Sequence, residues 1–98
     1  MTYDSALALS LVKARLNILP ANTTLDEYLS ARIEAAALEL TESGIRLRED
    51  AADTMLLVDM AVWQYQSRDK DAGMPEWLRL RRRERWLRDR AKGGEAGE

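Results

Sequence analysis

Glycines and prolines divide this 98-residue chain into four stretches, and each stretch repeats its apolar residues at helical spacing. The breaks fall at Pro20, at Gly44, between Gly73 and Pro75, and at the glycines that follow Lys92. No stretch alternates apolar and polar residues for long enough to predict a strand. The sequence therefore predicts an all-α fold: one small four-helix bundle-like domain over residues 1–92, with a flexible C-terminal tail over residues 93–98.

The first helix is expected over about residues 4–17, with Asp4 or Ser5 as its N-cap. Its apolar residues fall on two faces, with Leu9, Val12 and Leu16 on one and Leu7, Leu11 and Ala14 on the other. One face can pack into the core of the domain. The other must be covered by another helix or another molecule, so Leu7 and Leu11 are candidate interface residues.

The second helix is expected to begin with a capping box, because Thr24 is followed three positions later by Glu27. Its core face is a single stripe formed by Leu25, Leu29, Ile33, Ala36 and Leu40. Gly44 is expected to end this helix at the C′ position. After it, Ile45 and Leu47 alternate with arginines, which indicates an extended linker with two buried side chains.

The third helix is expected over about residues 50–68, with Asp50 as its N-cap and Asp53 near the positive end of the helix dipole. Apolar residues surround most of its axis, which is typical of a central, buried helix. Asp59 interrupts this apolar surface. Because buried charges are nearly always paired, we expect Asp59 to pair with an arginine such as Arg68, Arg81 or Arg85.

The fourth helix is expected to begin with Pro75 at its first position and to end near Ala91. We expect Trp77, Leu80 and Leu87 to form its core face. Trp86 lies nine residues after Trp77, which places it half a turn away, pointing outward among Arg79, Arg82 and Arg90. Arg82 or Arg90 can stack on the indole. Because tryptophan and arginine are enriched at binding hot spots, this side of the helix is a candidate protein interface.

Charge is unevenly distributed, although the net charge is only −2. Residues 1–76 contain 7 basic and 13 acidic residues, whereas residues 77–92 contain 8 basic and 2 acidic residues. An acidic body joined to a basic helix can attract further copies of the chain or an acidic partner.

Several functional classes are disfavoured by composition. The chain lacks cysteine and histidine, and it contains no phosphate-binding glycine loop and no calcium-loop pattern. We therefore expect no enzyme activity, no catalytic residue, no cofactor and no metal. The longest apolar run is too short for a membrane span, so a soluble, intracellular protein is expected. Sequence-specific DNA binding is a weaker alternative, because the body is acidic and the third helix is too apolar to read a groove.

The stretch from Asp53 to Arg83 resembles the small all-helical head–tail connector proteins of tailed bacteriophages, which are neck adaptors of the head-completion type. The similar elements are an apolar helix, its Arg68–Asp69 end and a basic helix that starts at Met74–Pro75. The residues that carry the similarity are Leu56, Leu57, Ala61, Trp63, Tyr65, Leu78 and Arg79.

This resemblance implies a structural virion protein that acts by assembly. Connectors of this family form a ring on the portal vertex, extend the channel through which DNA passes, and offer a platform to the next neck or tail-completion protein. The implied partners are further copies of the chain, the portal protein and that downstream protein, in the virion neck and, during assembly, in the host cytoplasm. The alternative is a small helical adaptor or regulatory protein that binds an acidic surface through its basic C-terminal helix. The candidate protein-interface residues are Trp86, Arg79, Arg82, Arg90, Leu7 and Leu11.

Overall fold

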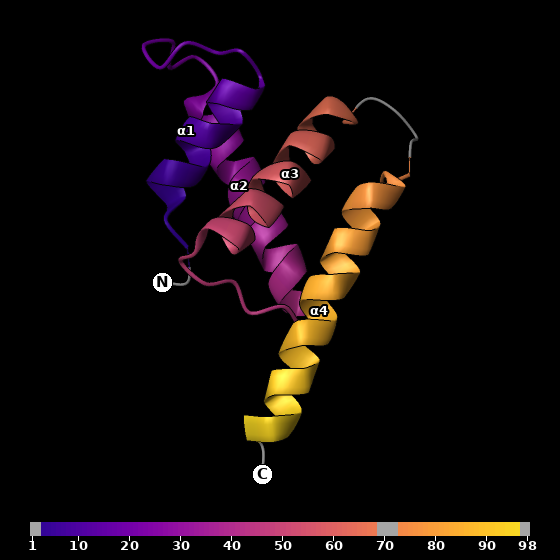
Figure 1. Ribbon diagram of the computed structural model, residues 1–98. Helices are drawn as coiled ribbons and strands as arrows, with labels where there is room; N and C mark the ends of the chain where they lie inside the picture. Colours follow the sequence, from indigo (N-terminus) through magenta and orange to yellow (C-terminus); the bar gives the residue numbers. More distant parts are fainter. Residues whose placement is uncertain (1–2, 69–72, 97–98) are drawn as a thin grey trace.

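Four α-helices form the fold, which confirms the predicted all-α class (Figure 1). The computed structural model describes residues 3–68 and 73–96, the last six of these by their backbone alone. The helices are α1 (Ser5–Arg15), α2 (Asp26–Glu42), α3 (Ala51–Gln66) and α4 (Glu76–Ala96). None of the described helices is long and apolar enough to cross a membrane.

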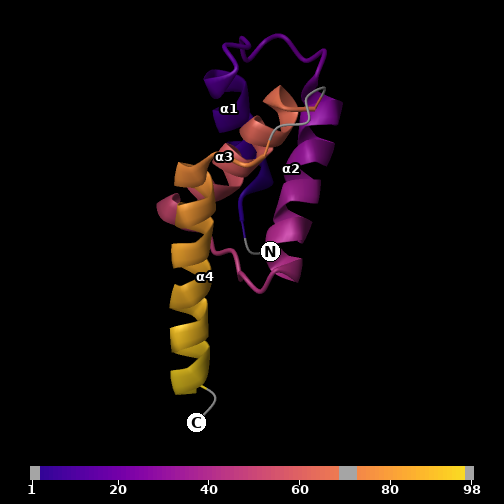
Figure 2. The ribbon, with the colours of Figure 1, turned by 90° about the vertical axis from the view of Figure 1, so that its right-hand side faces the viewer.

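Helices α1, α2 and α3 pack on one another, and α4 packs against α3 on the side that faces away from α1 (Figures 1 and 2). The C-terminal half of α4 runs past the ends of the other helices, so the molecule has a packed body and a projecting helix. Its principal dimensions of 49 × 30 × 18 Å reflect this elongated shape.

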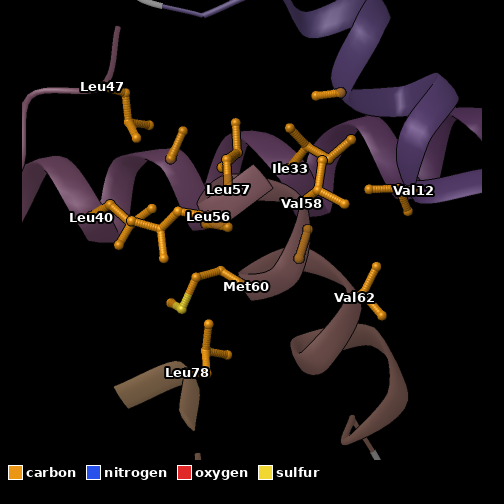
Figure 3. Packing of buried hydrophobic residues seen from close by; sticks show 14 of the residues in the cluster. Val12, Ile33, Leu40, Leu47, Leu56, Leu57, Val58, Met60, Val62 and Leu78 are labelled. Carbon is orange, nitrogen blue, oxygen red and sulfur yellow. The ribbon is translucent and has the colours of Figure 1, made fainter. Parts of the chain in front are cut away.

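The core is centred on α3, as predicted from the apolar residues around most of its axis. Every residue from Leu56 to Val62 is buried. Figure 3 labels five of these α3 side chains, which lie between Val12 of α1, Ile33 and Leu40 of α2, and Leu78 of α4: Leu56, Leu57, Val58, Met60 and Val62. Because α3 contacts all three other helices, it fixes their relative positions.

Two of the predicted N-caps are confirmed and one is wrong. The Asp4 and Asp50 carboxylates accept hydrogen bonds from the N–H groups of Leu7 and Asp53, respectively, at the starts of α1 and α3. The capping box at Thr24 does not form, because α2 begins at Asp26 and its N-cap is Leu25, whose side chain cannot accept a hydrogen bond. Thr24 instead belongs to the preceding turn, where its N–H donates to Asn22 Oδ1.

Gly44 ends α2 as predicted. Its φ of +105° places it in the left-handed region that glycine adopts without steric cost. The N–H of Gly44 donates to the carbonyl of Thr41, and that of Ile45 donates to the carbonyl of Leu40, which is the Schellman pattern. The linker that follows is extended, with Ile45 and Leu47 buried as expected.

The fourth helix differs from its predicted limits at both ends. Pro75 lies just before its first residue, and its carbonyl accepts from the N–H groups of Leu78 and Arg79. The helix continues to Ala96 rather than ending near Ala91. Most of the predicted tail over residues 93–98 is therefore helical backbone, and residues 97–98 lie outside the described chain.

Candidate protein-docking surface on the fourth helix

The orientation of α4 about its axis is the main difference from the sequence-based expectation. The expected core residues Trp77, Leu80 and Leu87 are 51%, 53% and 48% exposed. Leu78 and Arg85, seven residues apart, are the most buried of the described α4 side chains, at 0% and 6% exposure. The predicted core face of this helix is therefore wrong.

An ion-pair network between α3 and α4 explains this orientation. The Arg85 guanidinium binds both oxygens of the Asp53 carboxylate, from Nε at 2.6 Å and from Nη2 at 2.9 Å. It also lies 2.6 Å from Asp89 Oδ1 and donates to the carbonyl of Arg46. Two carboxylates and a carbonyl thus compensate the burial of one arginine, and α4 turns that arginine inward.

Both carboxylates in this network also hold the linker between α2 and α3. Asp53 accepts from the N–H of Arg48 at 2.8 Å, and Asp89 accepts from the N–H of Arg46 at 2.7 Å. Asp53 therefore does more than the sequence indicated, because it joins α3, α4 and the linker at one buried point.

The pKa values of these groups reflect their mutual stabilisation. Burial raises the pKa of Asp53, but the hydrogen bonds from Arg85 and Arg48 and the charge of Arg85 outweigh it, so the pKa lies below its usual value. At Asp89, the opposing effect of burial is likewise exceeded by the bonds from Arg46 and Arg85, and the pKa is lowered. The hydrogen bond to Asp53 is the largest effect that raises the pKa of Arg85.

Asp59 is paired with arginines from two other helices. Its buried carboxylate contacts Arg15 of α1 at 2.5 Å and Arg81 of α4. The predicted pairing with an arginine is confirmed for Arg81, whose guanidinium also lies 5.4 Å from the ring centre of Trp77. Asp53 and Asp59 line one groove of about 590 Å³ between α3 and α4, and their oxygens are already occupied by arginines.

Trp86 does not point outward, which corrects a central expectation. Its indole is half-buried and packs against the core at the C-terminal end of α2. A Cβ atom at Gly44 would lie only 2.9 Å from Trp86 Nε1, so the missing side chain leaves the space that the indole fills. The predicted stacking is confirmed for Arg90, whose guanidinium lies 5.1 Å from the indole centre.

Three of the predicted interface residues line one groove. Arg79, Arg82 and Trp86 surround a hollow of about 720 Å³, together with Leu80, Arg83 and two residues directly after α2, Ser43 and Ile45. Leu7 and Leu11 are not part of it, because they belong to α1 and α3 lies between α1 and α4 (Figure 1). Leu7 is 46% exposed, whereas Leu11 is half-buried against the core.

The outward side of α4 carries residues that the sequence interpretation assigned to the core. Trp77, Leu80 and Leu87 fall within about 80° of the helix circumference. Arg83 and Arg88 flank them, and neither forms an ion pair with any residue that the structure describes. We call Trp77, Leu80, Arg83, Glu84, Leu87 and Arg88 the outer face of α4; Glu84 is its one acidic residue, and the two arginines leave the face basic. A sequence signal existed, since the three- and four-residue steps Trp77–Leu80–Glu84–Leu87 are also those of a helix that packs on a partner helix.

In the described part of the chain, no group of three acidic, cysteine or histidine residues could hold a metal ion. No family model matches the chain, and the searches of curated proteins and of solved structures found no significant match.

Proposed function

We propose that this protein is a structural assembly subunit of the phage head–tail connector type, which forms a ring on a portal vertex. The observation that supports this most is the outer face of α4, where three large apolar side chains are about half exposed on one side of the helix. Large apolar residues gathered on one exposed helix face are typical of protein–protein contacts. The resemblance of residues 53–83 to connector proteins supplies the type of assembly.

The ion pairs of α4 suit such a role. Arg85 and Arg81 bind α4 to α3 at two points of the helix. A helix fixed to the body in this way presents its outer face in a defined direction, which reduces the entropy cost of association. In this proposal the body is the scaffold and α4 is the docking element.

The test is electron microscopy and sedimentation velocity of the concentrated protein, alone and mixed with the portal protein that the proposal implies as its partner. We expect closed rings, either in the protein alone or on the portal. Monomers at every concentration, together with no binding to the portal, would contradict the proposal.

The second candidate is a helical adaptor that binds one acidic protein. Arg83 and Arg88 favour it, because they form no ion pair with any described residue. It predicts a complex of fixed small stoichiometry and no ring. Duplex DNA in a gel-shift assay at moderate salt separates both candidates from DNA binding, which alone predicts a shifted band.

A further inference from the structure

We infer that the outer face of α4 docks on the exposed side of α2 in a second copy of the chain. The inference deepens the proposed function, because it names the two surfaces that meet when subunits assemble. It rests on that proposal only for the claim that copies of the chain associate.

The exposed side of α2 has the composition that the outer face of α4 requires. Leu38 is 58% exposed, and Ala31 and Ala35 lie beside it within about 60° of the helix circumference. Small residues at these positions allow another helix to approach closely. This apolar strip leaves room for the larger side chains Leu80, Leu87 and Trp77.

Charge complements this apolar match. Glu27, Glu34 and Glu42 are exposed on the same side of α2, and none of them forms an ion pair with a described residue. Arg83 and Arg88 are similarly unpaired beside Leu80 and Leu87. Docking would therefore bring free carboxylates to free guanidinium groups, which favours encounter and fixes the orientation of the two helices.

Contact between two α4 helices is disfavoured by the same charges. Each outer face is flanked by arginines, so a symmetric pair would place guanidinium groups of both copies side by side. Like charges brought together at an interface oppose association. The partner that complements the outer face of α4 is an acidic, partly apolar helix, and α2 of another copy is such a helix.

Because the two docking surfaces are different, each subunit that joins can bind a further subunit. In the view of Figure 2, α2 and α4 form opposite edges of the molecule. A contact between two different surfaces leaves one free surface of each kind on every pair of subunits. Such a heterologous contact generates a ring if the rotation closes and a filament if it does not.

Cysteine cross-linking tests this arrangement directly, because the chain contains no cysteine of its own. Leu38→Cys and Leu87→Cys are made as two separate full-length variants, at the concentration or on the portal where association is observed. A disulfide forms only when the two Cα atoms come within about 7 Å. We expect cross-linked dimers when the two variants are mixed and oxidised, and none from either variant alone.

The matched control is Leu19→Cys, in the α1–α2 connection, where the wild-type side chain is 74% exposed. Mixed with Leu87→Cys, it should give no dimer. A dimer from Leu87→Cys alone would overturn the inference in favour of an α4–α4 contact. Equal cross-linking of the control would show random collision and would also overturn it.

A charge-reversal experiment provides a second test. Arg83→Glu with Arg88→Glu should weaken association about tenfold or more, and Glu34→Arg with Glu42→Arg in the mixed second variant should restore it. Rings that form without the Leu38–Leu87 cross-link and without this rescue would overturn the inference and leave the proposed function standing. The absence of any association, with or without portal, would overturn both.

Discussion

Arg85 is the residue on which the position of α4 depends. Its guanidinium is buried between Asp53 and Asp89, and its removal leaves the Asp53 carboxylate buried without a counter-charge. Such unpaired burial is costly, whereas exposed arginines contribute little to stability.

We therefore expect Arg85→Met to lower the free energy of unfolding by about 3–5 kcal/mol, measured by urea denaturation. Arg88→Met is the matched control, since Arg88 is exposed and forms no ion pair with a described residue, and it should change stability by less than about 0.5 kcal/mol. Equal effects of the two substitutions would contradict the role assigned to Arg85.

The same network predicts a loss of stability in acid. The pKa values of Asp53 and Asp89 are lowered in the folded protein, so the unfolded chain binds more protons as the pH falls below the ordinary aspartate pKa of about 3.9. Their contribution is complete above that value and disappears as the pH drops through the lowered pKa values. Urea unfolding between pH 7 and pH 2.5 should show this decline, and Asp53→Asn should flatten it. An unchanged slope in Asp53→Asn would argue against the network as its source.

Gly44 combines a backbone requirement with a packing requirement. Its positive φ disfavours any L-residue, and a Cβ atom there would collide with the Trp86 indole. Gly44→Ala should destabilise the protein by about 1 kcal/mol or more, measured as a lower midpoint of unfolding. Gly73→Ala is the control, because nothing lies within 4 Å of a Cβ atom at that position. Equal midpoints for the two variants would contradict this account.

At the scale of the elements, the four helices could be predicted from the sequence, but the orientation of α4 about its axis could not. The apolar residues of α2 form a single stripe, and those of α3 surround most of its axis. Because burial of apolar area dominates helix packing, these patterns determine which faces of the two helices are buried. On α4, apolar residues point in several directions, so periodicity alone cannot select one. The ion pairs of Arg85 determine which side of α4 faces the body. One partner, Asp89, is four residues away on α4, but the other, Asp53, lies 32 residues earlier in the chain, and a local sequence pattern cannot predict such a distant pair.

The observed orientation of α4 predicts that substitutions on its outer face affect association, whereas substitution of Trp86 affects stability. Leu80→Ser with Leu87→Ser should lower the unfolding free energy of the monomer by less than about 1 kcal/mol and abolish association, measured by urea denaturation and sedimentation velocity, respectively. Trp86→Ala should instead lower stability by about 1–3 kcal/mol, because the indole is half-buried against the core. If the double serine variant destabilised the monomer as much as Trp86→Ala, the outer face of α4 would be part of the core.

At the scale of the whole molecule, the sequence predicted the four helices, the buried α3 and the contrast between an acidic body and a basic helix. It also placed Arg79, Arg82 and Trp86 together, and they do line one groove. It did not predict which side of α4 remains exposed. Which surfaces of a small helical domain are left uncovered depends on tertiary pairing, and the docking proposal follows from that pairing.

The most direct test of the account is an electron cryomicroscopy reconstruction of the assembled protein, alone or on the portal. The account predicts subunits joined through the projecting helix, with Leu80 and Leu87 covered by Leu38 and the acidic side of α2 from the neighbouring copy. An assembly in which Leu80 and Leu87 remain in contact with solvent would contradict it.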